Sequence, residues 1–270
     1  MKRKNIYRKE FLETSKYPTK VTREKYTVLE CRWSDFSESE QESILAEAQV
    51  LYESANPTGA NTGLHRLNHK KYIDSLSGVM AEFATTKFFH KYLGLEAQRP
   101  VVTTTHNQID ISFEYKGKTY TVEVRSSFVQ NGIPFALYGF NYKNQKTFFD
   151  VLGPYKQENH KQDFESVKDL FIRVLFDIKD QSTDGFQNDR KFYTDRNYFI
   201  EKYLRNDAPF YIIGGMSGYK IMQENYTKSL TPRDLAQYSS SIKAGEYHVA
   251  QISNIDDIQF FVDYYSHKAL

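Results

Sequence analysis

The feature that most constrains the fold is a stretch of period-two alternation interrupted by one short break. Residues 109–115 and 119–126 alternate apolar and polar side chains around Lys116-Gly117-Lys118. Every second side chain of a strand lies on the same face, and two such runs joined by a glycine-containing break predict a β-hairpin. One face of this hairpin is apolar and indicates a core face, formed by Ile111, Phe113, Tyr115, Tyr120, Val122 and Val124.

The position of the turn decides which polar side chains meet on the other face. A two-residue turn at Lys116-Gly117 places Asp110 directly opposite Glu123. A turn shifted by one residue, at Gly117-Lys118, places Asp110 opposite Arg125. Both registers keep Asp110, Glu123 and Arg125 on one face, and only a three-residue loop would separate them.

Two carboxylates that face each other across a strand pair repel, so something has to offset them. A divalent metal ion, Arg125 or a raised pKa on one acid would do so. Mg²⁺ takes oxygen ligands from one or two carboxylates, and it activates water and neutralises charge on a phosphodiester. The hairpin therefore predicts a hydrolytic metal site, and a solvated charged face is the alternative interpretation.

The remaining pattern indicates an α/β fold. Apolar residues at helical spacing predict helices near 38–54 and 69–93, the second ended by Gly94. Further segments are a strand at Val101–Thr105, strands at 170–176 and 210–213, helical stretches near 190–205, a strand at 247–252 and a helix at 254–264. Gly214-Gly215-Met216-Ser217-Gly218 could suggest a phosphate loop, but it lacks the G-K-S/T ending of a P-loop and is interpreted as a turn after the strand at 210–213. We expect residues 1–66 to form an N-terminal helical extension to a main domain at 67–270, the two making one compact unit.

The helix over 69–93 carries the pattern G-x-x-x-E-x-A-x-x-K, in which Glu82 is the acid. With Asp110 before one strand and Glu123-x-Arg125 on its hairpin partner, the chain resembles the PD-(D/E)xK nuclease superfamily of restriction endonucleases and phage nucleases. The resemblance covers roughly residues 69–264. It implies a restriction endonuclease-like fold, a mixed β-sheet core flanked by helices. Arg125 stands where that superfamily usually has lysine, and arginine does not give up its proton.

The resemblance implies that Glu82, Asp110 and Glu123 hold Mg²⁺, for which Mn²⁺ can substitute, and that Arg125 stabilises the phosphate. The expected activity is a metal-dependent, type II restriction-type endonuclease that cuts double-stranded DNA as a homodimer. Two alternatives stay open. One is a catalytically impaired nuclease fold that binds DNA, and the other is a repair or phage nuclease acting on branched DNA or RNA.

Several residues around the hairpin are candidates for contact with nucleic acid. They are Ser126, Ser127, Gln130, Asn131, Lys143 and Lys146. Hydroxyl and lysine side chains contact phosphates, and amide side chains read base edges. Ordinary solvated loops are the alternative. His65 and His69 are four residues apart and could share a metal ion on a helix, but a basic patch is the preferred interpretation because no third ligand follows.

Composition supplies the remaining expectations. The net charge of +2 indicates that any DNA contact is made by local patches, not by a global basic field. Cys31 is the only cysteine, so an internal disulfide and a cysteine-based zinc site are excluded. The sequence has no signal peptide pattern and no apolar run of membrane-spanning length, so we expect a cytoplasmic protein with no membrane partner.

Overall fold

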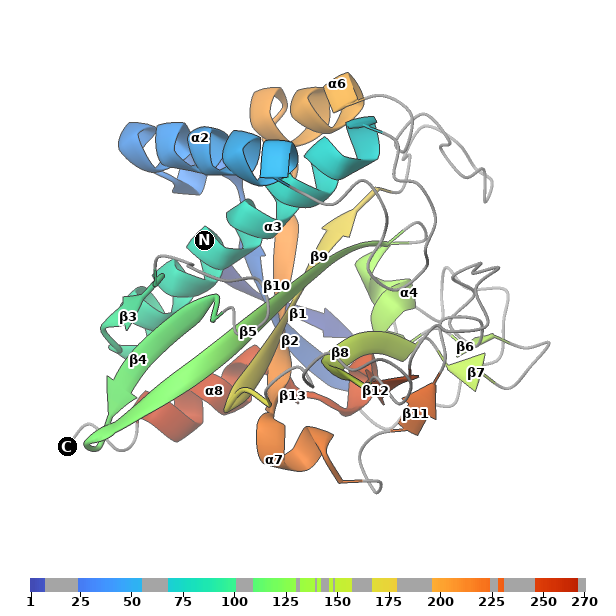
Figure 1. Cartoon of the computed structure of the whole chain (residues 1–270). Helices are drawn as coiled ribbons and strands as arrows, with labels where there is room; N and C mark the ends of the chain where they lie inside the picture. The colour runs from blue at the N-terminus through green and yellow to red at the C-terminus, as the bar shows by residue number, and fades with distance from the viewer. Residues whose placement is uncertain are drawn as a thin grey trace.

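A computed structural model gives the arrangement of the chain (Figure 1). The residues that it describes are 1–7, 24–54, 68–100, 109–129, 132–138, 140–141, 146–147, 149–156, 167–178, 196–223, 228–230 and 246–266. The expected strand at 101–105 lies outside them. No helix within these ranges has the length and hydropathy needed to cross a bilayer.

A mixed, mostly antiparallel open sheet forms the centre of the described fold, in the strand order β1-β2-β10-β9-β5-β4-β3, with β13 paired to β10. The strands are β1 Lys2–Tyr7, β2 Lys25–Cys31, β3 Ala97–Gln98, β4 Ile111–Tyr115, β5 Lys118–Val129, β9 Leu170–Asp177, β10 Phe210–Ser217 and β13 Asp256–Asp257. The pairing of β5 with β9 is parallel, and the other pairings of this sheet are antiparallel.

Helices cover one face of this sheet. They are α2 Glu38–Ser54, α3 Asn68–Phe88 with its π-helical continuation η2 Phe89–Leu93, α6 Arg196–Phe199 with its continuation η3 Ile200–Arg205, and α8 Ile258–Ser266. In Figure 1, α2 lies against α3, and α3 runs along the strands towards β3. The buried core on this face joins Leu76, Met80 and Phe88 of α3 to Val122 of β5 and Val174 of β9.

Smaller elements cover the other face. These are α4 Ile133–Tyr138, α7 Gly218–Ile221, the short helix η4 Ile252–Asn254, and a small sheet of β8 Phe149–Lys156, β12 Glu246–Gln251 and β11 Lys228–Leu230. A two-stranded ladder of β6 Phe140–Asn141 and β7 Lys146–Thr147 lies apart from it. A second core packs here, with Tyr26 and Val28 of β2, Phe171 and Leu175 of β9, and Leu137 of α4. The short helix η1 Trp33–Asp35 packs instead with the core of the helical face.

Most of the expected elements are confirmed. The helix predicted near 38–54 is α2, and the helix predicted over 69–93 is α3 with η2, which ends at Gly94 with a φ of 65°. The hairpin is β4 with β5. The tail helix begins later than predicted, at Ile258, because residues 256–257 form β13 on the edge of β10.

Two expectations are wrong. The first is the purely helical N-terminal extension, because β1 and β2 belong to the central sheet. β2 is buried on both faces from Tyr26 to Cys31, so its sequence lacks the alternation of a half-exposed strand. The second is the turn over residues 214–218, where β10 instead continues to Ser217 and α7 begins at Gly218. A Cβ at Gly214 would collide with the backbone of Asp256, so glycine serves close strand packing there.

Candidate active site

The hairpin adopts the first of the two expected registers. Tyr115 pairs with Lys118 and Ile111 pairs with Val122, so the turn is Lys116-Gly117. Both turn residues have positive φ, 52° and 73°, as a two-residue turn of type I′ requires. The ladder begins at Ile111, and Asp110, one residue before it, falls opposite Glu123.

Asp110 is fixed to the partner strand by its carboxylate. Its Oδ2 accepts a hydrogen bond of 2.7 Å from the backbone N–H of Val124, which lies between Glu123 and Arg125. Asp110 is only 8% exposed. Burial, reinforced by the negative charge of Glu82, raises the pKa of Asp110 to about 7. The N–H of Val124 and the positive charges of Arg125 and Lys168 oppose this rise.

Glu82 of α3 lies beside the hairpin acids and has a cationic partner of its own. Burial raises its pKa, and the charges of Glu47 and Glu123 add to this effect. Arg99 opposes them, because its Nη2 and Nε donate to Glu82 Oε2 at 2.7 and 3.2 Å. The same guanidinium binds both carboxylate oxygens of Glu47 in α2, at 3.1 and 2.7 Å. It also stacks over the ring of Phe83, 4.1 Å from the ring centre.

Glu123 and Arg125 form an ion pair on the same strand. Arg125 Nε lies 3.1 Å from Glu123 Oε1, and the two side chains are 30% and 12% exposed. Side chains two residues apart on a strand share a face, so this pairing follows from the E-x-R spacing. The four residues expected to carry catalysis therefore form one connected group. Glu82 acts electrostatically on Asp110 and is itself affected by Glu123, and Arg125 acts on Asp110 and pairs with Glu123.

Two buried cations beside this group were not expected from the sequence. Arg173 of β9 is the registered partner of Arg125, is 4% exposed, and donates from Nη2 to Ser127 Oγ. Lys168, two residues before β9, is also 4% exposed, and its charge acts on Asp110. Only the parallel pairing of β5 with β9 brings them here, and no local sequence pattern predicts a pairing between such distant segments.

The expected nucleic-acid contacts are placed only in part. Ser127 shares the face of Glu123 and Arg125, whereas Ser126 faces the other side, as strand alternation requires. Lys146 belongs to β7, but its side chain is not described. Gln130, Asn131 and Lys143 lie outside the described residues, as does His65, so its pairing with His69 is untested.

The three carboxylates of this group differ in how well they fit a magnesium ion. Within the described ranges, no group of three or more histidine, cysteine, aspartate or glutamate residues is arranged to hold a metal ion. Magnesium, however, is commonly bound through one or two carboxylates together with water and substrate phosphate. Asp110 and Glu123 fit that smaller requirement. Glu82 fits it less well, because Arg99 already binds its Oε2 from two nitrogens.

Comparison with known proteins adds no relative. No family model, no curated protein and no solved structure matches the chain. The described fold is a mixed α/β arrangement with an open, mostly antiparallel sheet flanked by helices.

Proposed function

We propose that this chain is a metal-dependent nuclease that hydrolyses DNA phosphodiester bonds, with a restriction endonuclease-like fold. One observation carries the proposal. The buried carboxyl of Asp110, with a pKa of about 7, lies opposite Glu123 in the hairpin register, with Glu82 and Arg125 beside it. Carboxyls held together in this way destabilise the fold, and perturbed pKa values of this kind cluster at functional sites.

The residues divide into distinct roles in this proposal. Asp110 and Glu123 would hold Mg²⁺, which when bound supplies charge neutralisation at the phosphodiester and an activated water. Glu82 strengthens the local negative potential, and Arg99 holds its carboxylate in place. Arg125 remains protonated, so its part is to orient Glu123 and to face the phosphate, not to accept a proton.

Cleavage of supercoiled plasmid DNA in Mg²⁺ tests the proposal directly. Wild type should nick or linearise the plasmid, and EDTA should stop the reaction. Asp110→Ala should abolish it, whereas Asp74→Ala, which removes a carboxylate paired with Lys70 elsewhere on α3, should not. Cleavage by Asp110→Ala at the wild-type rate would rule out this site. A restriction-type enzyme should in addition give discrete fragments and behave as a homodimer in solution.

The ion pair between Arg125 and Glu123 favours a second candidate, a nuclease fold that binds DNA without cutting it. If the acids of this group do not hold a metal ion, calorimetry will detect no Mg²⁺ binding in wild type, nor in Arg125→Lys, which removes the guanidinium. DNA binding without cleavage in both proteins would then favour the binding protein. Detectable Mg²⁺ binding that disappears in Asp110→Ala would favour the enzyme.

A further inference from the structure

Lys168 lies two residues before β9, at the end of that strand where its pairing with β5 begins. Val122 of β5 is the registered partner of Leu170, and Glu123 is that of Phe171. Asp110, Glu123 and Phe171 therefore stand in one row across three strands, and Lys168 precedes this row by three residues. At about 3.3 Å per residue, its Cα lies about 10 Å along the strand from the row. Glu123 is in addition one strand away from β9 and Asp110 two strands away, at about 4.8 Å for each strand. A lysine side chain that points along the strand is long enough to cover most of the separation along β9.

The backbone at Lys168 is held from two sides. The next residue, Asp169, accepts hydrogen bonds at its Oδ2 from the N–H and hydroxyl of Thr121 in β5, both at 3.0 Å. Its carbonyl oxygen accepts from the N–H of Gly218, at 2.8 Å. A Cβ at Gly218 would collide with the carbonyl oxygen of Lys168, so the start of α7 closely approaches the segment that precedes β9. The root of the Lys168 side chain is thereby fixed relative to β5.

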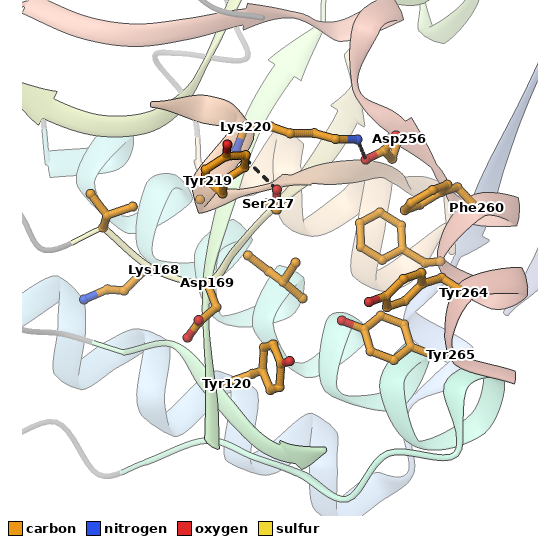
Figure 2. A pocket seen from close by; sticks show the side chains of 14 residues that line it. Tyr120, Lys168, Asp169, Ser217, Tyr219, Lys220, Asp256, Phe260, Tyr264 and Tyr265 are labelled. Atoms are coloured by element: carbon orange, nitrogen blue, oxygen red, sulfur yellow. Dashed lines mark hydrogen bonds and ion pairs between the residues drawn. The ribbon is translucent and has the colours of Figure 1, made fainter. Parts of the chain in front are cut away.

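The direction of the side chain is visible in Figure 2. Lys168 contributes to one wall of a cavity of about 450 Å³ at the end of the sheet, but its ammonium extends away from the cavity. Lys220, on another wall of the same cavity, points instead across the rim to Asp256, 2.9 Å away. Lys168 is 4% exposed and its charge acts on Asp110, so it is a buried cation within electrostatic reach of that acid.

We infer that Lys168 is a further catalytic residue, whose ammonium donates a hydrogen bond to a nonbridging oxygen of the scissile phosphate. This inference rests on the proposed nuclease function. Lys168 forms no covalent bond and accepts no proton in this role. It acts as a compact charge that stabilises the negative charge developing on the phosphate in the transition state. It thus supplies from β9 a lysine that the hairpin lacks, since position 125 is arginine.

Two measurements on the full-length protein test this role. In single-turnover cleavage with Mg²⁺, Lys168→Met should be about 100-fold slower than wild type or worse, the usual effect of removing one such donor. In metal-free buffer no cleavage occurs, and the affinity of Lys168→Met for duplex DNA can be measured. This affinity should depend less on salt than that of wild type, with the slope of log K against log salt smaller in magnitude by about one. Lys220→Met, the matched control from the same cavity, should resemble wild type in both.

A compensating variant separates a catalytic role from a structural one. Adding Arg125→Lys to Lys168→Met returns an ammonium to the acids from the hairpin side and should recover at least tenfold in rate. If Lys168→Met does not fold, Lys168→Arg takes its place. It should keep the salt slope but cleave at least tenfold more slowly, because a planar guanidinium does not reproduce a compact ammonium.

The outcomes are distinguishable from failure of the proposed function. If wild type cleaves and Asp110→Ala does not, but Lys168→Met (or Lys168→Arg in its place) cleaves within threefold of wild type, the role of Lys168 is overturned and the nuclease assignment stands. The role of Lys168 is also overturned if Lys168→Met has the salt slope of wild type and the addition of Arg125→Lys to it recovers no cleavage rate. If wild type fails to cleave, or Asp110→Ala cleaves equally well, both proposals are wrong.

Discussion

The substitution Asp110→Asn tests the electrostatics of the site without relying on catalytic activity. An aspartate in an unfolded chain has a pKa of about 3.9, whereas the pKa of Asp110 in the folded chain is about 7. Between these pH values the folded chain keeps a proton that the unfolded chain has lost. The free energy of unfolding therefore falls as pH rises from about 4 to about 7, and above that the loss is complete.

The size of this effect follows from the two pKa values. Each unit of difference corresponds to about 1.36 kcal/mol, so complete ionisation of Asp110 costs the fold about 4 kcal/mol. Asparagine does not ionise, and its side-chain oxygen can still accept the hydrogen bond from Val124. Relative to wild type, Asp110→Asn should therefore gain up to about 4 kcal/mol of stability between pH 4 and pH 8.

The assay is chemical denaturation of both proteins in EDTA at low salt, from pH 4 to pH 8. Only the difference between variant and wild type is informative, because other carboxyls act in the opposite direction. Despite partial burial, hydrogen bonds from Lys87 and Lys118 lower the pKa values of Glu40 and Asp169, so their stabilising contributions are lost as pH falls. A difference that stays constant with pH, or that favours wild type at pH 8, would refute the reasoning.

Two further substitutions, each with a matched control, test the partner of Glu82 and the packing of the central sheet. Arg99→Met leaves Glu82 buried without its two-nitrogen partner and should lower the free energy of unfolding by about 3–5 kcal/mol, measured by urea denaturation. Lys70→Met, which breaks a more exposed pair with Asp74, should change it by less than about 1 kcal/mol; equal effects would contradict the assignment. Gly215→Ala drives a Cβ into the carbonyl oxygen of Phe171 and should lower the melting temperature by an amount equivalent to about 1–3 kcal/mol. In Gly78→Ala the new Cβ meets nothing within 4 Å, so the same measurement should show a rise of up to about 1 kcal/mol.

The elements predicted correctly are those whose signals are local. The hairpin is fixed by period-two alternation and by a turn of two residues with positive φ, all within 109–126. The helix at 68–88 is fixed by its apolar stripe and by the left-handed Gly94 after η2. Because these signals do not depend on distant segments, the side chains that they place, Asp110 and Glu123 on the hairpin and Glu82 on the helix, were also predicted.

The elements predicted wrongly depend on distant partners. β2 is a strand because β1 and β10 pair with it on both sides, and its burial on both faces removes the alternating pattern. Gly214 continues β10 because the backbone of β13 lies against it, a contact between segments more than 40 residues apart. When only the neighbouring residues are considered, two adjacent glycines predict a turn. The same two glycines also permit the close approach of another strand, which the neighbouring sequence does not reveal.

The same distinction explains why the acids were found from the sequence and most of their counter-charges were not. Glu123 has its cation two residues away, so the E-x-R spacing reveals the pair. Glu82 is compensated by Arg99 from beyond η2, and Asp110 in part by Lys168 from the strand parallel to β5. At Asp110 and at Glu82 the compensating charges do not outweigh burial, since the pKa of Asp110 is about 7 and that of Glu82 is also raised. An additional cation beside Asp110 would therefore stabilise the folded chain, and that is where the proposed chemistry requires one.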